Sequence, residues 1–402
     1  MVRIPEITRI IKPSPIRVFT ERIIEVAKNN SVLRFDIGDR AFIPKIDPGG
    51  FRDEDSKYSS SGGYLELRKL VAQEYSKYDI SYENIGITEG SSLGLLYSIA
   101  GMLGSDVGEG IIVPTPGFAT YDACAKVGKG YVVPLPCRFE DGFKLPSENS
   151  IDKLIMDHNG NERKINAIIL TSPSNPTGHV LSREEYETVA AVANKHDLIV
   201  LVDRAYERFD FTDNPVNPFE IGSLRDRLIG FFTFSKTYGL SGARVGAFVT
   251  ANPDLSEYIF NILDNLSSRP GYSQRVAIQI YESTNADLLR QMNDKFKKRM
   301  EIAAEELSEI EGLQVNIPKG SFYIYPRILG MDTKEFFYFV FSEEYYKSHK
   351  INSFIPGSAF YFGNGKTDEA RFALVQNQGA IREGIRLFGK QLEDYRKHIR
   401  GA

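Results

Sequence analysis

Short apolar runs rich in β-branched and aromatic residues alternate with helical stretches through the middle of the chain. Such an alternation is typical of a mostly parallel sheet whose strands are joined by crossover helices. Six runs are strand candidates: Asn84–Thr88, Ile111–Pro114, Tyr131–Leu135, Ala167–Leu170, Ile199–Val202 and Ile229–Phe234.

One of the connections carries a helix start. Ser182 and Glu185 have the spacing of a capping box, in which each side chain binds the backbone N–H of the other residue. Apolar residues then recur on one helical face, at Tyr186, Val189, Ala190 and Ala193. This connection and the two strands beside it are therefore predicted to form a βαβ unit.

The pattern changes after about residue 285. A long charged helix is followed by strand candidates at Leu313–Ile317, Phe322–Tyr325 and Phe372–Val375, with helices between and after them. The first 45 residues contain one helix, at about Arg17–Lys28, and a short strand, Leu33–Ile37. We expect a large domain over residues 46–285, and a smaller α+β domain over residues 286–402 together with an N-terminal arm, residues 1–45.

Composition excludes several classes of function. The chain has 402 residues, more than one hydrophobic core ordinarily holds, so two lobes with a cleft between them are expected. The net charge is −4, so the chain lacks the excess of basic residues that binding to nucleic acids requires. No apolar run is long enough for a signal sequence or a membrane span. We therefore expect a cytoplasmic protein that binds neither nucleic acid nor membranes.

Metal and disulfide chemistry are not expected either. The only two cysteines, Cys124 and Cys137, have no metal-binding spacing, and the five histidines are scattered singly along the chain.

Polar side chains follow three of the predicted strands, where ligands of open parallel sheets collect. Asn175 lies in a Pro- and Gly-rich turn, Asp203 follows five apolar residues with Tyr206 close behind, and Lys236 follows an aromatic strand. A buried carboxylate needs a cation or strong donors, and a buried lysine is readily held as the neutral amine that forms imines. Taken alone, Asn175 also fits an ordinary loop, and Asp203 also fits a structural cap.

The three motifs together resemble a known family. The runs Ser-Pro-Ser-Asn-Pro-Thr-Gly, Val-Asp-Arg-Ala-Tyr and Ser-Lys-Thr-Tyr-Gly-Leu-Ser-Gly-Ala-Arg-Val-Gly, in this order, are similar to those of fold-type I, class I/II aminotransferases, which depend on pyridoxal 5′-phosphate. The resemblance covers nearly the whole chain. It implies an α/β fold with a mostly parallel seven-stranded sheet, and ping-pong transfer of an amino group between an L-amino acid and a 2-oxo acid.

The resemblance also assigns the catalytic residues. It makes Lys236 the residue that carries the cofactor as a Schiff base and then moves the Cα proton. Asp203 would face the pyridine nitrogen and keep it protonated, and Asn175 and Tyr206 would donate hydrogen bonds to the phenolate oxygen of the ring. Phe118 would stack on the ring, although an ordinary core phenylalanine explains it as well.

The cofactor phosphate needs donors and positive charge. Ser91 and Ser92 fall at a predicted helix N-terminus, which suits an anion. By resemblance, Ser235 and Arg244 would add a hydroxyl and a guanidinium, and Tyr58 would reach in from a partner subunit. The resemblance therefore implies a homodimer with shared active sites.

The substrate carboxylate is best bound by a guanidinium. Arg371 holds the place of the arginine that does this in the family, with Gly38 and Asn175 beside the same carboxylate. Without the family pattern, Arg371 would be interpreted as an exposed arginine that precedes a strand.

The fold alone leaves the reaction and the substrate open. C–S β-lyases, cyclopropane-forming synthases and decarboxylating or cyclising enzymes share this cofactor site, but transamination needs only the lysine and the carboxylate-binding arginine. A cofactor-binding sensor is disfavoured because no winged-helix segment is appended. Aspartate-using relatives often have Lys where this chain has Ser92, and its absence weakens an aspartate assignment. Arg40 either binds an acidic group of the substrate or is a solvated arginine of a turn. Apolar or aromatic substrates would suit the remaining candidates, Phe118, Tyr121, Phe322 and Tyr323.

Overall fold

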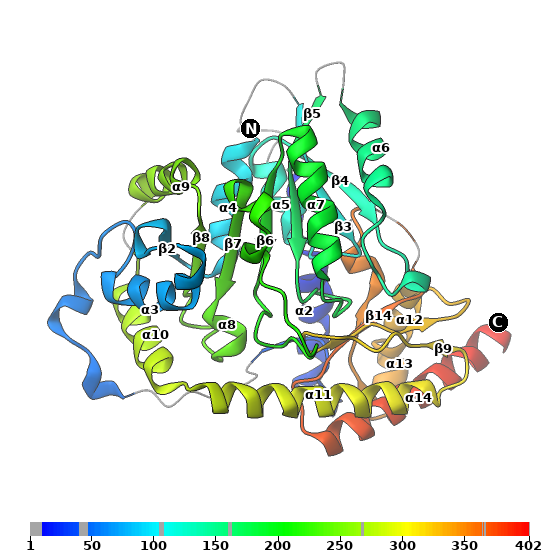
Figure 1. Cartoon of the computed structure of the whole chain (residues 1–402). Coiled ribbons are helices and arrows are strands. Elements are labelled where there is room, and N and C mark those ends of the chain that lie inside the picture. Colours follow the sequence, from blue (N-terminus) through cyan, green and yellow to red (C-terminus); the bar gives the residue numbers. More distant parts are fainter. Residues whose placement is uncertain are drawn as a thin grey trace, which may run out of the picture.

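The computed structural model describes residues 10–39, 47–103, 108–159, 163–266, 269–363, 365 and 367–401. Its centre is a seven-stranded sheet in the order β2-β8-β7-β6-β5-β3-β4 (Figure 1). Five neighbouring strands, from β4 to β7, run parallel, and β8 is antiparallel to both β7 and β2. The strands are β2 Ile85–Thr88, β3 Gly108–Thr115, β4 Tyr131–Pro136, β5 Arg163–Thr171, β6 Ile199–Asp203, β7 Leu228–Thr233 and β8 Gly246–Thr250.

Helices cover both faces of this sheet, which explains why its strands are apolar almost throughout. Adjacent strand residues point to opposite faces. Ile111, for example, belongs to an apolar cluster that includes residues of α4, α5 and α9, whereas Ile112 belongs to a cluster that includes residues of α3, α6, α7 and α10. These helices are α3 Leu65–Tyr75, α4 Ser91–Met102, α5 Thr120–Val127, α6 Glu148–His158, α7 Arg183–His196, α9 Pro253–Leu266 and α10 Gly271–Ser283.

A second layer combines the two ends of the chain. The helix α2, Pro15–Ala27, packs with C-terminal residues in one apolar cluster, and β1, Val32–Leu33, pairs in parallel with β12. A small antiparallel sheet has the order β10-β14-β13. The remaining elements are α11 Ala286–Ser308, β9 Leu313–Gln314, β10 Tyr323–Ile324, β11 Arg327–Ile328, α12 Thr333–Val340, α13 Glu343–Tyr346, β12 Ile351–Asn352, β13 Ile355–Pro356, β14 Ala370–Ala373 and α14 Gln378–Gly401.

The predicted fold class is confirmed, and the six strand candidates correspond to β2 to β7. The capping box at the start of α7 is also confirmed, since Ser182 Oγ accepts from the Glu185 N–H and Glu185 accepts from the Ser182 N–H. The strand expected at Leu313–Ile317 is shorter, with only its first two residues paired. The strand expected at Phe372–Val375 begins two residues earlier, so that Arg371 lies within β14. The proposed domain boundaries stay a prediction.

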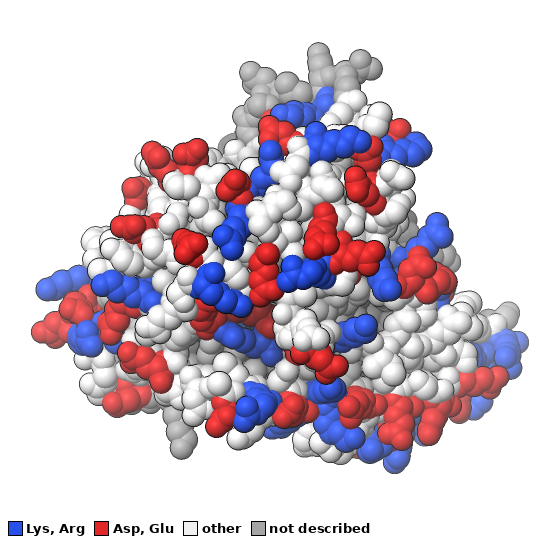
Figure 2. Space-filling model, viewed as in Figure 1, with Lys and Arg blue, Asp and Glu red and all other residues white. Residues whose placement is uncertain are grey.

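The surface carries both signs of charge. Figure 2 shows basic and acidic side chains intermixed over the face in view, without a face of one sign. Among the described helices, none is both long and apolar enough to cross a membrane.

Candidate active site

A cavity of about 260 Å³ opens at the carboxyl ends of β5, β6 and β7. Residues from the central sheet, from the N-terminal segment and from the small sheet all line it. Every predicted site residue is among them except Tyr58. The lining residues are Ile16, Asp36, Ile37, Gly38, Ser91, Ser92, Phe118, Tyr121, Thr171, Asn175, Asp203, Ala205, Tyr206, Thr233, Ser235, Lys236, Ser241, Arg244, Tyr323 and Arg371.

Asp203, the last residue of β6, is a buried carboxylate held only by neutral donors. The Tyr121 hydroxyl donates to Oδ2 over 2.8 Å and the Ala205 N–H donates to Oδ1 over 3.0 Å. Burial raises the pKa of Asp203, and these two hydrogen bonds and the charge of Lys236 oppose that rise. Among the described residues no ion pair includes Asp203. A cation placed in the cavity beside it would therefore be strongly stabilised.

Lys236 lies in the short helix α8, Phe234–Thr237, directly after β7. Its Nζ donates to the backbone carbonyl of Gly38 over 2.7 Å. A side chain at position 38 would be obstructed, because a Cβ atom there would lie 2.3 Å from Phe322 Cε2 and 2.3 Å from the Tyr323 hydroxyl. The glycine thus allows the N-terminal segment to bring its carbonyl to the lysine.

Arg371 is 3% exposed and its guanidinium is fixed from several directions. Nη1 donates to Asn175 Oδ1 over 2.9 Å, and Nη2 donates to the Asp36 carbonyl over 2.6 Å. The guanidinium carbon also lies 4.3 Å from the ring centre of Tyr323. Arg371 Nε has no partner among the described residues, so donor capacity remains for an added carboxylate.

Tyr206 follows β6 and faces the small sheet. Its hydroxyl lies 3.1 Å from the hydroxyl of Tyr323. Burial raises the pKa of Tyr206 well above its usual value, so the side chain is a neutral hydrogen-bond donor.

Ser91 and Ser92 begin α4, which is capped by Gly90 in a left-handed conformation with φ 78°. Arg244 Nη1 lies 3.4 Å from Ser235 Oγ, and a Cβ atom on Gly90 would come within 2.7 Å of Arg244 Nη2. The glycine therefore lets the N-terminus of α4 with its two serines, the Ser235 hydroxyl and the Arg244 guanidinium converge. These groups suit a phosphate dianion.

Phe118 is partly buried, lines the cavity and packs edge-to-face on Tyr121 with ring centres 5.7 Å apart. This position is compatible with ring stacking, and the stacking role stays a prediction.

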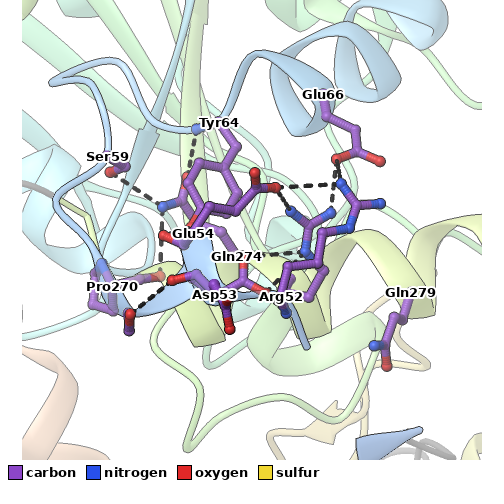
Figure 3. A network of polar contacts seen from close by, with 12 residues as sticks. Arg52, Asp53, Glu54, Ser59, Tyr64, Glu66, Pro270, Gln274 and Gln279 are labelled. Carbon is purple, nitrogen blue, oxygen red and sulfur yellow. Dashed lines mark hydrogen bonds and ion pairs between the residues drawn. The ribbon is translucent and has the colours of Figure 1, made fainter. Parts of the chain in front are cut away.

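Tyr58 is the predicted site residue that does not join the others, because its side chain is 95% exposed. The segment that carries it is nevertheless firmly held (Figure 3). Arg275 binds Glu54, Asp55 and Glu66, and the Ser59 hydroxyl donates to the Arg269 carbonyl. A held segment with an exposed tyrosine is compatible with a contact to a second copy of the chain.

Two cavity residues have contacts that the sequence did not reveal. The sequence suggests Tyr121 and Tyr323 only as neighbours of a substrate side chain, yet Tyr121 hydrogen-bonds to Asp203 and Tyr323 to Tyr206. Arg40 lies outside the described residues.

The fold and the cavity define an α/β protein in which a lysine side chain and the N-terminus of α4 line one cavity at the carboxyl ends of parallel strands. The family model for "Aminotransferase class I and II" matches residues 51–357. An aspartate aminotransferase from Sulfolobus acidocaldarius is 30% identical over 386 residues, 90% of each chain. An aromatic-amino-acid aminotransferase 2 from Thermococcus litoralis is 31% identical over 75% of this chain and 76% of its own.

The solved structures agree on the fold. Aspartate aminotransferase from Thermus thermophilus, determined with maleate, superposes with a TM-score of 0.82 at 19% identity, over 97% of this chain and 100% of the other. The chain belongs to the class I and II aminotransferases, a family that depends on pyridoxal 5′-phosphate. The predicted family and enzyme class are thereby confirmed.

Proposed function

We propose that this aminotransferase binds pyridoxal 5′-phosphate in the cavity, attached to Lys236, and prefers L-amino acids with apolar or aromatic side chains. The observation that carries the cofactor assignment is Asp203, a buried carboxylate with two neutral donors, a raised pKa and no ion pair with a described side chain. A protonated pyridine nitrogen is the partner that such a carboxylate lacks. When bound, the cofactor supplies an electron sink for cleavage of the Cα–H bond.

The chain itself orients the reactants and moves the proton. Once the substrate amino group has displaced it, the free Lys236 Nζ would take the proton from the substrate Cα and then give that proton up to complete the transfer. The Gly38 carbonyl, which accepts from Nζ over 2.7 Å, would keep the amine in the cavity. Arg371 binds the substrate carboxylate, helped by Asn175. Tyr206 and Asn175 donate to the cofactor oxygen, and Phe118 stacks on its ring.

Four residues hold the phosphate end. Ser91 and Ser92 offer the N-terminus of α4, and Ser235 and Arg244 face it from the other side. Tyr58 of a second copy completes this end, so that the protein acts as a homodimer with shared sites. The exposure of Tyr58 on a firmly held segment supports this proposal. The cytoplasmic location stays a prediction.

The substrate preference follows from charge. The basic residues in the described lining are Lys236, Arg244 and Arg371, and each has a role above. No further cation of the described lining is available for a second carboxylate, whereas Ile16 and Ile37 present apolar surface. Transfer of a carboxylate into such surroundings without a cation is costly. The names of the relatives include both aspartate and aromatic aminotransferases, so they do not decide the matter.

A panel of half-reactions tests the proposal. The purified holoenzyme is mixed with Phe, Tyr, Leu, Asp or Glu, and the cofactor absorbance is followed through one turnover. Phe, Tyr or Leu should convert the cofactor at least about tenfold faster than Asp, equivalent to about 1.4 kcal/mol. The matching 2-oxo acid should reverse the change. Faster conversion by Asp would refute the substrate preference, and no conversion by any amino acid would refute transamination.

A further inference from the structure

Tyr323 contacts both Arg371 and Tyr206 in the cavity. It begins β10, which pairs with the strand β14 that carries Arg371, and its side chain is buried. Its ring lies against the Arg371 guanidinium at 4.3 Å, and its hydroxyl lies 3.1 Å from the Tyr206 hydroxyl. Tyr323 therefore joins the residue proposed for the substrate carboxylate to a residue proposed for the cofactor oxygen.

The hydrogen bond between the two tyrosines has a required direction once the cofactor is bound. Each hydroxyl carries a single hydrogen. If Tyr206 donates its hydrogen to the cofactor oxygen, it can only accept from Tyr323. Tyr323 then donates to Tyr206, and each donation polarises the next, which strengthens the donation that reaches the cofactor.

The charge of Arg371 acts on this chain of donors. A guanidinium against the face of the Tyr323 ring attracts its electrons and makes the hydroxyl a stronger donor. A carboxylate bound to Arg371 compensates that charge, and the hydroxyl becomes a weaker donor. The Asn175 side chain, which accepts from Arg371, offers a second and separate connection.

We propose that Tyr323 is a positioning residue that passes the charge state of Arg371 on to Tyr206, so that a substrate carboxylate on Arg371 weakens the donation of Tyr206 to the cofactor oxygen. This inference rests on the proposed function. Its consequence is that filling the carboxylate site raises the pKa of the bound cofactor. The reason is that a weaker hydrogen bond from Tyr206 stabilises the negatively charged cofactor oxygen less. The free amino group of the substrate then meets the protonated cofactor.

Other charges surround the same groups and must stay constant in a test. The charged side chains of the described lining are Asp36, Asp203, Lys236, Arg244 and Arg371. Asp203 and Arg371 both act on the pKa of Tyr206, Asp203 raising it and Arg371 lowering it. Tyr323→Phe changes none of these charges and keeps the ring against Arg371, so it removes only the hydroxyl.

The experiment is a pH titration of the absorbance of the bound cofactor in the wild-type holoenzyme, in Tyr323→Phe and in Tyr325→Phe. Tyr325 is a buried tyrosine two residues along the chain, whose hydroxyl donates to the Gly357 carbonyl. Each protein is titrated alone and with saturating 3-phenylpropionate, a carboxylate that has no amino group to transfer.

In the wild type, 3-phenylpropionate should raise the pKa of the bound cofactor. Tyr323→Phe should raise it without the ligand by about 0.5 to 1 pH unit, as expected for one lost hydrogen bond. The ligand-induced rise should then fall to about half or less of the wild-type value. Tyr325→Phe should match the wild type in both titrations.

A double-mutant cycle with Tyr206→Phe separates the route through Tyr206 from other effects. Tyr323→Phe should add nothing on the Tyr206→Phe background, and full additivity would overturn the relay. Identical titrations of the wild type and Tyr323→Phe would overturn it as well, as would an equal effect of Tyr325→Phe. A wild-type cofactor with no pH-dependent absorbance would instead overturn the cofactor assignment, and the relay with it.

Discussion

Asp203→Asn should have opposite effects on the protein with and without its cofactor. The substitution removes the charge and keeps the shape of the side chain. In the cofactor-free chain the carboxylate is buried and bound by only two neutral donors, Tyr121 and Ala205. Its raised pKa shows that burial outweighs these donors. Each unit by which the folded pKa exceeds the unfolded one costs about 1.4 kcal/mol of stability above both values.

The sign of the pH dependence follows from that shift. Since the folded state holds the Asp203 proton more tightly than the unfolded state, stability falls as pH rises from the unfolded pKa to the folded one, and is level beyond it. Asp203→Asn lacks this decline. The cofactor-free variant should therefore be as stable as the wild type at low pH and more stable near pH 7.

Cofactor binding should change in the other direction. Removing one partner of a buried ion pair costs about 3–5 kcal/mol, which is a loss in affinity of about a hundredfold to several thousandfold. The assay is a titration of the cofactor-free protein with pyridoxal phosphate, together with thermal unfolding of both forms between pH 4 and 8.

Asp210→Asn is the matched control. Asp210 is also a carboxylate whose pKa is raised by burial, and it lies outside the cavity lining. This variant should alter stability and leave cofactor affinity at the wild-type value. The reasoning is refuted if Asp203→Asn binds the cofactor as tightly as the wild type, or if Asp210→Asn weakens binding equally.

Three further substitutions test other parts of the site. Arg371→Lys keeps the charge but loses the fork, so kcat/KM for amino donors should fall about tenfold to a hundredfold, and an unchanged value would contradict its role. Gly38→Ala should lower the free energy of unfolding by about 1–3 kcal/mol, because a Cβ atom there would lie 2.3 Å from the Tyr323 hydroxyl; equal melting temperatures would contradict the contact. Tyr58→Phe should leave the stability of the subunit within about 0.5 kcal/mol of the wild type, since the side chain is 95% exposed. It should weaken cofactor binding about tenfold, and unaltered binding would contradict a contact from the partner subunit.

Much of the central sheet could be predicted because its strands follow a local rule. A strand covered on both faces is apolar at almost every position, and β5 to β7 each show such a run before a polar residue. Asp203 is the last residue of β6, and Asn175 and Lys236 follow the ends of β5 and β7. Since the strands are parallel and adjacent, the sequence already indicates that these residues meet.

The missed features depend on pairings between distant segments. The strand β8 is only five residues long, and its partner β2 precedes it by more than a hundred residues, with Ile85 opposite Val249. Local periodicity contains no information about that pairing. The same holds for Val32 opposite Ile351, the pairing that attaches the N-terminal strand β1 to the C-terminal strand β12.

The hydrogen-bond partners of the site were hidden for a related reason. Tyr121 belongs to the apolar face of α5, but its hydroxyl reaches Asp203 at the end of β6. Tyr323 likewise continues an apolar strand. Whether the hydroxyl of a buried tyrosine finds a carboxylate or a second hydroxyl is decided by the packing of two elements, which a residue pattern on either element does not contain.

The attachment of the cofactor to Lys236 is the central claim, and one chemical measurement tests it directly. The holoenzyme is treated with sodium borohydride, which makes the bond between the cofactor and an amine permanent, and is then digested and analysed by mass spectrometry. The added mass should be found on the peptide containing Lys236, and the Lys236→Ala protein should carry none. Labelling of a different lysine in the wild type, or equal labelling of Lys236→Ala, would contradict the account.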